Sequence, residues 1–156
     1  MARYNKFDKT RDDPFPISRS GIDQFIRDPR TFVLQRKYGV KPPSFAPLTL
    51  AIATDHLLKN EFDGYRDKQS SKHPIFKKFG LGVVPYQHPE IETWRNNFKG
   101  IRYLHEATNL EVFGAVDDIW EDINSKELYI VDYKSTSKKG DPDIETGWGY
   151  SYKRQM

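Results

Sequence analysis

Three side chains suited to catalysis, Asp117, Asp132 and Lys134, lie in the stretches GAVDDIW and YIVDYKS of the C-terminal half. Both stretches are rich in β-branched and aromatic residues, which predicts strands, and residues two apart in a strand share a face, so Asp132 and Lys134 point the same way. Asn124-Ser125 marks the turn between the strands. A two-residue loop there places Asp117 opposite Asp132, a four-residue loop places it opposite Lys134, and a three-residue loop separates the groups. The sequence leaves all three registers open.

Two carboxylates on one patch of a sheet repel each other unless a positive group lies between them. Lys134 is one candidate for that group and a divalent cation is another, because hard oxygen ligands with open coordination positions suit Mg²⁺ or Mn²⁺. Such an ion would stabilise charge on a phosphodiester and acidify a water, which Lys134 would orient or help to deprotonate. The alternative is a structural Asp–Lys pair on a solvated surface, because Asp-x-Lys alone is a weak motif.

A third ligand is expected on a helix predicted over residues 48–66, where Asp55 and His56 are adjacent. His56 has mostly polar neighbours at helical spacing, which predicts a surface position. A carboxylate in an apolar stripe is costly unless it is paired or bound to a cation, so Asp55 is either a metal ligand or the partner of a lysine or arginine. On that helix Asp55 shares a face with four apolar residues, which lie three, four or seven positions away from it: Leu48, Ala51, Leu58 and Phe62.

Hydrophobic periodicity and turn residues indicate the elements that position these groups. Residues 1–16 form an irregular arm and residues 40–47 a linker. Ser18 or Ser20 caps a short first helix, and Pro29 fits the first turn of a second. Beyond the helix over residues 48–66, the expected elements are a helix over 89–98, a meander of three strands over 101–107, 110–123 and 127–136, and the start of a helix at 150–156.

The composition is that of one folded domain covering residues 1–156, with 37% hydrophobic and 14% aromatic residues. Having no cysteine, the chain can form no disulfide or thiolate metal site. There is no apolar run long enough to span a membrane and no apolar stretch typical of a secretory signal. Because the chain has no cysteine, a reducing cytosol is the simplest compartment, and we expect a cytoplasmic protein. The net charge of +3 permits a polyanionic partner. Basic residues often adjoin aromatics, and Tyr152 and Arg154 are expected to contact nucleic acid.

In order and spacing, these motifs resemble the RecB-like branch of the PD-(D/E)XK nuclease superfamily. The pattern is Gly-x-x-Asp at 114–117, apolar-Asp-x-Lys at 131–134 and Tyr-x-x-Gln at 152–155. The segment 17–40 (ISRSGIDQFIRDPRTFVLQRKYGV) is similar to the family's opening helices. The resemblance covers residues 17–156, and the combination of motifs is more specific than any one of them.

This resemblance implies an α/β fold with a restriction-endonuclease-like αβββαβ core behind N-terminal helices. It implies metal-dependent cleavage of DNA, with Asp117 and Asp132 as metal ligands and Lys134 serving the nucleophilic water. Gln155 and Tyr152, on the helix that follows, would support the site or contact the DNA backbone.

Three departures from the family pattern bear on these expectations. Iron–sulfur members have a cysteine before the Pro-Arg turn, whereas this chain has Asp28, so no iron–sulfur cluster is expected. Many members use a histidine of the early helix as a ligand, whereas the helical-face argument favours Asp55 over His56. The family's motif helix continues past its glutamine and is followed by another strand, so a chain ending at Met156 is expected to be truncated at its C-terminus.

The leading hypothesis is a Mg²⁺-dependent deoxyribonuclease of recombination, repair or phage replication, acting as an exonuclease or on single-stranded DNA or duplex ends. Asp55, Asp117 and Asp132 would hold the metal ion. The second hypothesis is a non-catalytic nucleic-acid-binding module on the same scaffold. A protein-interaction domain is the third, and it leaves the three carboxylates unexplained.

Overall fold

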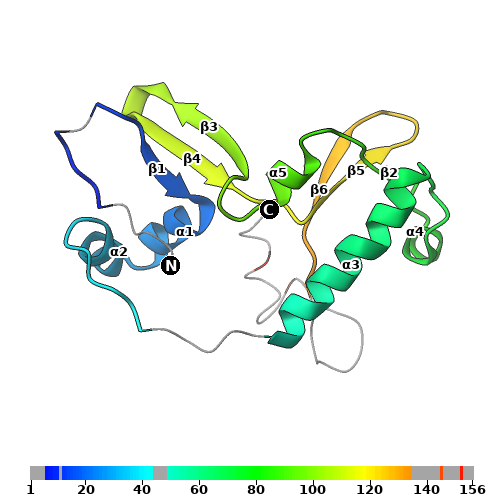
Figure 1. Ribbon diagram of the computed structural model, residues 1–156, viewed down its shortest axis with the longest axis horizontal. Coiled ribbons are helices and arrows are strands. Elements are labelled where there is room, and N and C mark those ends of the chain that lie inside the picture. The colour runs from blue at the N-terminus through cyan, green and yellow to red at the C-terminus, as the bar shows by residue number, and fades with distance from the viewer. Residues whose placement is uncertain (1–5, 11, 44–48, 135–144, 146–151, 153–156) are drawn as a thin grey trace.

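The N-terminal elements form where the capping residues predict them. The computed structural model describes residues 6–10, 12–43, 49–134, 145 and 152 (Figure 1). Helix α1 (Arg19–Arg27) begins after Ser18, whose hydroxyl accepts a hydrogen bond from the Gly21 amide. Helix α2 (Pro29–Arg36) begins after Asp28, whose carboxylate accepts from the Thr31 amide. Of the two candidate serines, Ser18 is therefore the cap.

The first sheet joins the end of the predicted arm to a hairpin far along the chain. Strands β3 (Ile101–His105) and β4 (Leu110–Gly114) pair antiparallel, and β1 (Phe15–Ser18) pairs parallel with β4, giving the order β1-β4-β3. The prediction of an irregular arm over 1–16 was therefore wrong for its last two residues. The reason is tertiary, because β1 exists through its pairing with β4 and not through a local pattern.

The second sheet is antiparallel and packs against the long helix. Its order is β2-β5-β6, from strands β2 (Val83–Pro85), β5 (Asp118–Asp122) and β6 (Leu128–Val131). Helices α3 (Thr49–Asp67), α4 (Pro74–Phe79) and α5 (Ile91–Arg95) lie in the same part of the molecule (Figure 1). The core between them consists of Phe62, Phe76 and Val83, with Leu58, Trp120 and Tyr133 packed against it.

The predicted three-stranded meander was wrong, because the predicted strand 110–123 is divided between the two sheets. β4 ends at Gly114, and β5 begins at Asp118 in the other sheet (Figure 1). Between them the Val116 amide donates to the Trp94 carbonyl oxygen at 3.1 Å, so the backbone leaves the first ladder. The α/β class is confirmed. Within the described residues, no helix is long and apolar enough to cross a membrane.

Candidate active site

The β5–β6 hairpin has the register expected from a two-residue loop. Asp118 pairs with Val131, and the Asp122 amide donates to the Glu127 carbonyl oxygen at 2.9 Å. One step beyond the last pair, this register places Asp117 opposite Asp132. The Tyr133 amide donates to Asp117 Oδ2 at 2.8 Å, which holds the Asp117 carboxylate against the end of β6.

Asp117 is half-buried and lies within the field of two other carboxylates. Burial is the largest influence and raises the pKa of Asp117 above its ordinary value, while the Tyr133 hydrogen bond and the Lys59 charge oppose the rise. The negative charges of Asp55 and Asp132 raise this pKa further.

Helix α3 contributes Asp55 and, one turn later, Lys59. Lys59 Nζ lies 2.9 Å from Asp55 Oδ2 and 3.4 Å from Asp117 Oδ1, so it links the helix carboxylate to the sheet carboxylate. The Asp55 side chain is 31% exposed, whereas His56 is classed with the exposed residues. Asp55 is thus the member of the pair that faces the cluster, and the lysine partner considered from the sequence is Lys59.

At the end of β6, Asp132 and Lys134 form an ion pair on the same side of the chain. Lys134 Nζ also lies 5.8 Å from the centroid of the Tyr152 ring, within the range of a cation–π contact. The remaining candidates on the C-terminal segment, Arg154 and Gln155, lie outside the described residues.

The donor chemistry of this cluster suits a hard divalent cation, because Asp55, Asp117 and Asp132 offer carboxylate oxygens. Lysines already engage these oxygens, Lys59 on Asp55 and Asp117 and Lys134 on Asp132. In the part of the chain that the structure describes, no group of three or more His, Cys, Asp or Glu residues is arranged to hold a metal ion. Ligation by these carboxylates therefore stays a prediction, and it requires the carboxylates as well as the lysines to move.

Sequence reasoning missed a buried ionic network directly behind the candidate site. Asp118 is completely buried and forms ion pairs with Arg66 and, at 3.1 Å, with Arg95. Asp63 forms ion pairs with the same two arginines. Although burial lowers the pKa of Arg95, the charges of Asp118 and Asp63 outweigh it and raise this pKa overall. The buried Asp118 and the partly exposed Asp63 thus neutralise the two buried arginines, as a buried network requires.

Tyr133 connects this network to the candidate site. Its hydroxyl donates to Asp118 Oδ2 at 2.8 Å, while its amide donates to Asp117. Burial is the largest reason that the Tyr133 pKa lies well above its ordinary value, followed by the charge of Asp118. The signal for this arrangement was the adjacent pair Asp117-Asp118, because successive strand residues face opposite sides and one of the two had to face the core.

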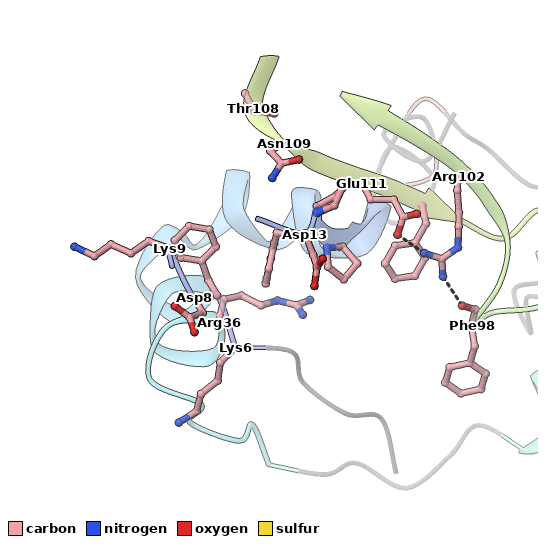
Figure 2. Close-up of a pocket in the computed structure, with 15 residues that line it drawn as sticks. Lys6, Asp8, Lys9, Asp13, Arg36, Phe98, Arg102, Thr108, Asn109 and Glu111 are labelled. Carbon is pink, nitrogen blue, oxygen red and sulfur yellow. Dashed lines mark hydrogen bonds and ion pairs between the residues drawn. The ribbon is translucent and has the colours of Figure 1, made fainter. Parts of the chain in front are cut away.

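A cavity lies elsewhere, beside the first sheet. The cavity has a volume of about 600 Å³. It lies between the N-terminal segment, α2 and the β3–β4 hairpin (Figure 2). Arg102 on its wall pairs with Glu111 and donates to the Phe98 carbonyl oxygen at 3.0 Å. Of the candidate residues that the structure describes, none lines this cavity.

The chain matches no protein-family model, no curated protein and no solved structure. The function must therefore be argued from the arrangement itself. Lys59 lies between Asp55 on α3 and Asp117 just before β5, and Lys134 pairs with Asp132 just after β6. These groups offer carboxylate oxygens to a cation, or ammonium groups to a phosphate once a carboxylate is neutralised.

Proposed function

We propose that this chain is a divalent-metal-dependent nuclease that hydrolyses phosphodiester bonds of DNA, on the restriction-endonuclease-like core that its motifs suggest. The observation that supports the proposal is that Lys59 lies between Asp55 and Asp117, while the hairpin register places Asp132, the partner of Lys134, opposite Asp117. Carboxylates of one helix and one hairpin face one another there, and burial makes the charge on Asp117 costly. A cation between them would relieve that cost.

In this proposal the three carboxylates hold Mg²⁺ or Mn²⁺ and Lys134 acts on the attacking water. The bound ion would draw charge from the phosphodiester and lower the pKa of a water. Lys134 lies beside Asp132, so its ammonium would be placed to donate to the water or to a phosphate oxygen. The Tyr133 amide keeps the Asp117 carboxylate oriented through its hydrogen bond.

The test is DNA cleavage in Mg²⁺ and in Mn²⁺ by the wild type and by the variants Asp132→Ala and Lys134→Ala. We expect each variant to lose at least about a hundredfold in rate, the usual effect of removing a group that stabilises charge or moves a proton. Lys126→Ala is the matched control, because Lys126 also pairs with a carboxylate, Glu121, but at the other end of the same hairpin. Undiminished cleavage by both site variants would eliminate the mechanism.

A non-catalytic nucleic-acid-binding module is the second candidate, and one observation favours it. In the described residues each of the three carboxylates already has a lysine within ion-pairing distance. Binding by such a module would persist in EDTA and weaken with rising salt, because lysines and arginines that contact phosphates release counterions. Cleavage that begins when Mn²⁺ is added would exclude this candidate.

A further inference from the structure

The cavity beside the first sheet has walls that hydrogen bonds hold together. The Phe7 amide donates to the Arg36 carbonyl oxygen at 2.7 Å, which fixes the N-terminal segment to the end of α2. The Phe15 amide donates to the Asn109 carbonyl oxygen at 2.9 Å, which fixes the same segment to the β3–β4 hairpin. With a volume of about 600 Å³, the cavity has the size of a ligand pocket. The proposed mechanism gives it no part.

Two phenylalanine side chains of the cavity wall lie open to solvent. Phe98 is 76% exposed and Phe7 is 50% exposed. A single exposed apolar side chain is ordinary, but two aromatic rings on one cavity offer flat surfaces to a ligand. Unpaired bases of a nucleic acid stack on such rings whatever their sequence.

Arg102 on the same wall is held in a fixed position. Its guanidinium lies over the Phe113 ring at 4.9 Å, pairs with Glu111, and donates to the carbonyl oxygens of Lys99 at 3.1 Å and Phe98 at 3.0 Å. The structure describes hydrogen bonds from three of the five N–H groups that a guanidinium carries. Because the side chain is already ordered and still 41% exposed, a phosphate can accept from it at little cost in side-chain entropy.

Positive charge is concentrated in the part of the chain that forms this wall. Residues 1–47 contain ten Lys or Arg against five Asp or Glu, whereas the rest of the chain contains 15 against 17. Arg36 extends from α2 toward the cavity, while Lys6 and Lys9 extend away from it (Figure 2). This distribution favours a ligand with negative charge.

The balance of charges around the cavity distinguishes between anions. Its described lining holds four cations but also three carboxylates: Asp8, Asp13 and Glu111. A compact ligand with several negative charges would be repelled by these carboxylates. A strand with one charge on each phosphate and an aromatic base beside it suits the mixture better.

We propose that this cavity holds a short stretch of single-stranded nucleic acid, with phosphates on Arg102 and Arg36 and bases stacked on Phe98 and Phe7. The inference rests on the proposed function for the kind of ligand, but it does not depend on a metal site. Phe113 lies four residues before Asp117, and an extended chain spans at most about 14 Å over four residues. A strand held in the cavity would therefore continue close to the candidate site.

The test is the fluorescence anisotropy of a labelled oligothymidylate of about twelve nucleotides, titrated with the whole chain in EDTA so that no cleavage occurs. We expect Phe98→Ala to weaken binding at least about fivefold, the scale of one base stacked on an aromatic ring, and Phe98→Trp to stay within about twofold of the wild type. Phe79→Ala is the matched control, because Phe79 is 63% exposed but does not line the cavity.

The phosphate contact is tested by Arg102→Gln over salt concentrations from about 50 to 200 mM. Binding should weaken at least about fivefold, and the slope of log K against log salt should become shallower by about 0.7, the effect of losing one phosphate contact on a single strand. Arg27→Gln removes the same charge from an ion pair with Asp23 on α1 and should leave the slope unchanged. Because Phe98 is so exposed, Phe98→Ala keeps the fold and decides the question if Arg102→Gln unfolds.

The outcomes separate the cavity from the proposed cleavage. Unchanged affinity in Phe98→Ala and Arg102→Gln overturns the assignment of the cavity, and so does a wild type that binds no strand; the cleavage assay then judges the nuclease function by itself. Equal affinity for the thymidylate–adenylate duplex overturns the assignment as well, because paired bases cannot stack on the rings. Free thymidine monophosphate that binds as tightly as the strand would show a nucleotide pocket instead. Asp132→Ala and Lys134→Ala should bind the strand like the wild type while losing cleavage.

Discussion

At the scale of single residues, Tyr133 donates hydrogen bonds to two carboxylates in different surroundings. Its amide holds Asp117, which is half-buried in the candidate site, and its hydroxyl holds Asp118, which is completely buried. Its ring stacks on Phe62 with centroids 5.6 Å apart. A single residue thus fixes the end of β6, where Asp132 and Lys134 lie, relative to the core.

Tyr133→Phe tests this connection, because it removes only the hydroxyl donor to a buried carboxylate. We expect the free energy of unfolding to fall by about 1.5–3 kcal/mol, the usual contribution of a hydrogen bond to a charged group. Urea denaturation measures this loss. Tyr129→Phe is the control on strand β6, which ends just before Tyr133; the Tyr129 side chain is 46% exposed, and its substitution should change stability by less than about 0.5 kcal/mol. Equal effects of both substitutions would contradict the assigned role of the Tyr133 hydroxyl.

The raised pKa of Asp117 predicts that its negative charge destabilises the metal-free fold. A carboxyl whose pKa is higher in the folded than in the unfolded protein favours folding below its ordinary pKa of 3.8, and this contribution is lost as the pH rises through the folded value. Asp117→Asn should therefore raise the melting temperature of the metal-free protein at pH 7. The advantage should disappear below about pH 3.8, where both forms are neutral.

Melting curves in EDTA at pH 3 and pH 7 measure this difference. Asp122→Asn is the contrasting variant, because amides of Ser125 and Asn124 lower the pKa of Asp122, so its charge favours the fold. That variant should be less stable than the wild type at pH 7. A destabilising effect of Asp117→Asn at pH 7 would show that Lys59 and the Tyr133 amide outweigh the burial of the charge.

At the scale of elements, local signals predicted the helices better than the strands. Ser18 caps α1, and Pro29 occupies the first turn of α2. Both signals depend only on residues next to the helix start, and both helices begin where these residues predict. The helix expected over 89–98 is shorter, because the backbone is already extended at Asn96. Strands β1 and β2 were missed, since each is short, contains proline and exists through a distant partner.

In the candidate site, too, contacts between neighbouring residues were easier to predict than contacts between distant elements. Asp117, Asp132 and Lys134 belong to one hairpin, and strand alternation was enough to predict that Asp132 and Lys134 share a face. The position of Asp117 depended on the loop length, which the sequence left open and the observed register decides. Helical spacing was enough to predict that Asp55, and not His56, faces inward. The ion pairs of Asp118 could not be predicted from the sequence. Their partners, Arg66 and Arg95, come from two helices, and no local sequence pattern shows that these helices pack on β5.

At the scale of the whole molecule, the candidate site lies at the junction between the two sheets. The chain leaves β4 at Gly114 and enters β5 at Asp118, so Asp117 is the last residue of the connection (Figure 1). Gly100, just before β3, approaches this connection closely and has φ of +60°. A Cβ on Gly100 would collide with the carbonyl oxygen of Gly114. The position of the junction therefore depends on a residue without a side chain.

Gly100→Ala should destabilise the molecule through both backbone conformation and this collision. Gly80→Ala is the matched control, because Gly80 has φ of +63° but an added Cβ there meets no atom within 4 Å. The left-handed conformation alone costs about 1–2 kcal/mol in either variant. Gly100→Ala should lose at least about 1 kcal/mol more in urea denaturation, because the backbone of Gly114 cannot yield as a flexible side chain would. Equal losses would mean that the junction relaxes freely, and Asp117 would then not be held in place by the contact between Gly100 and Gly114.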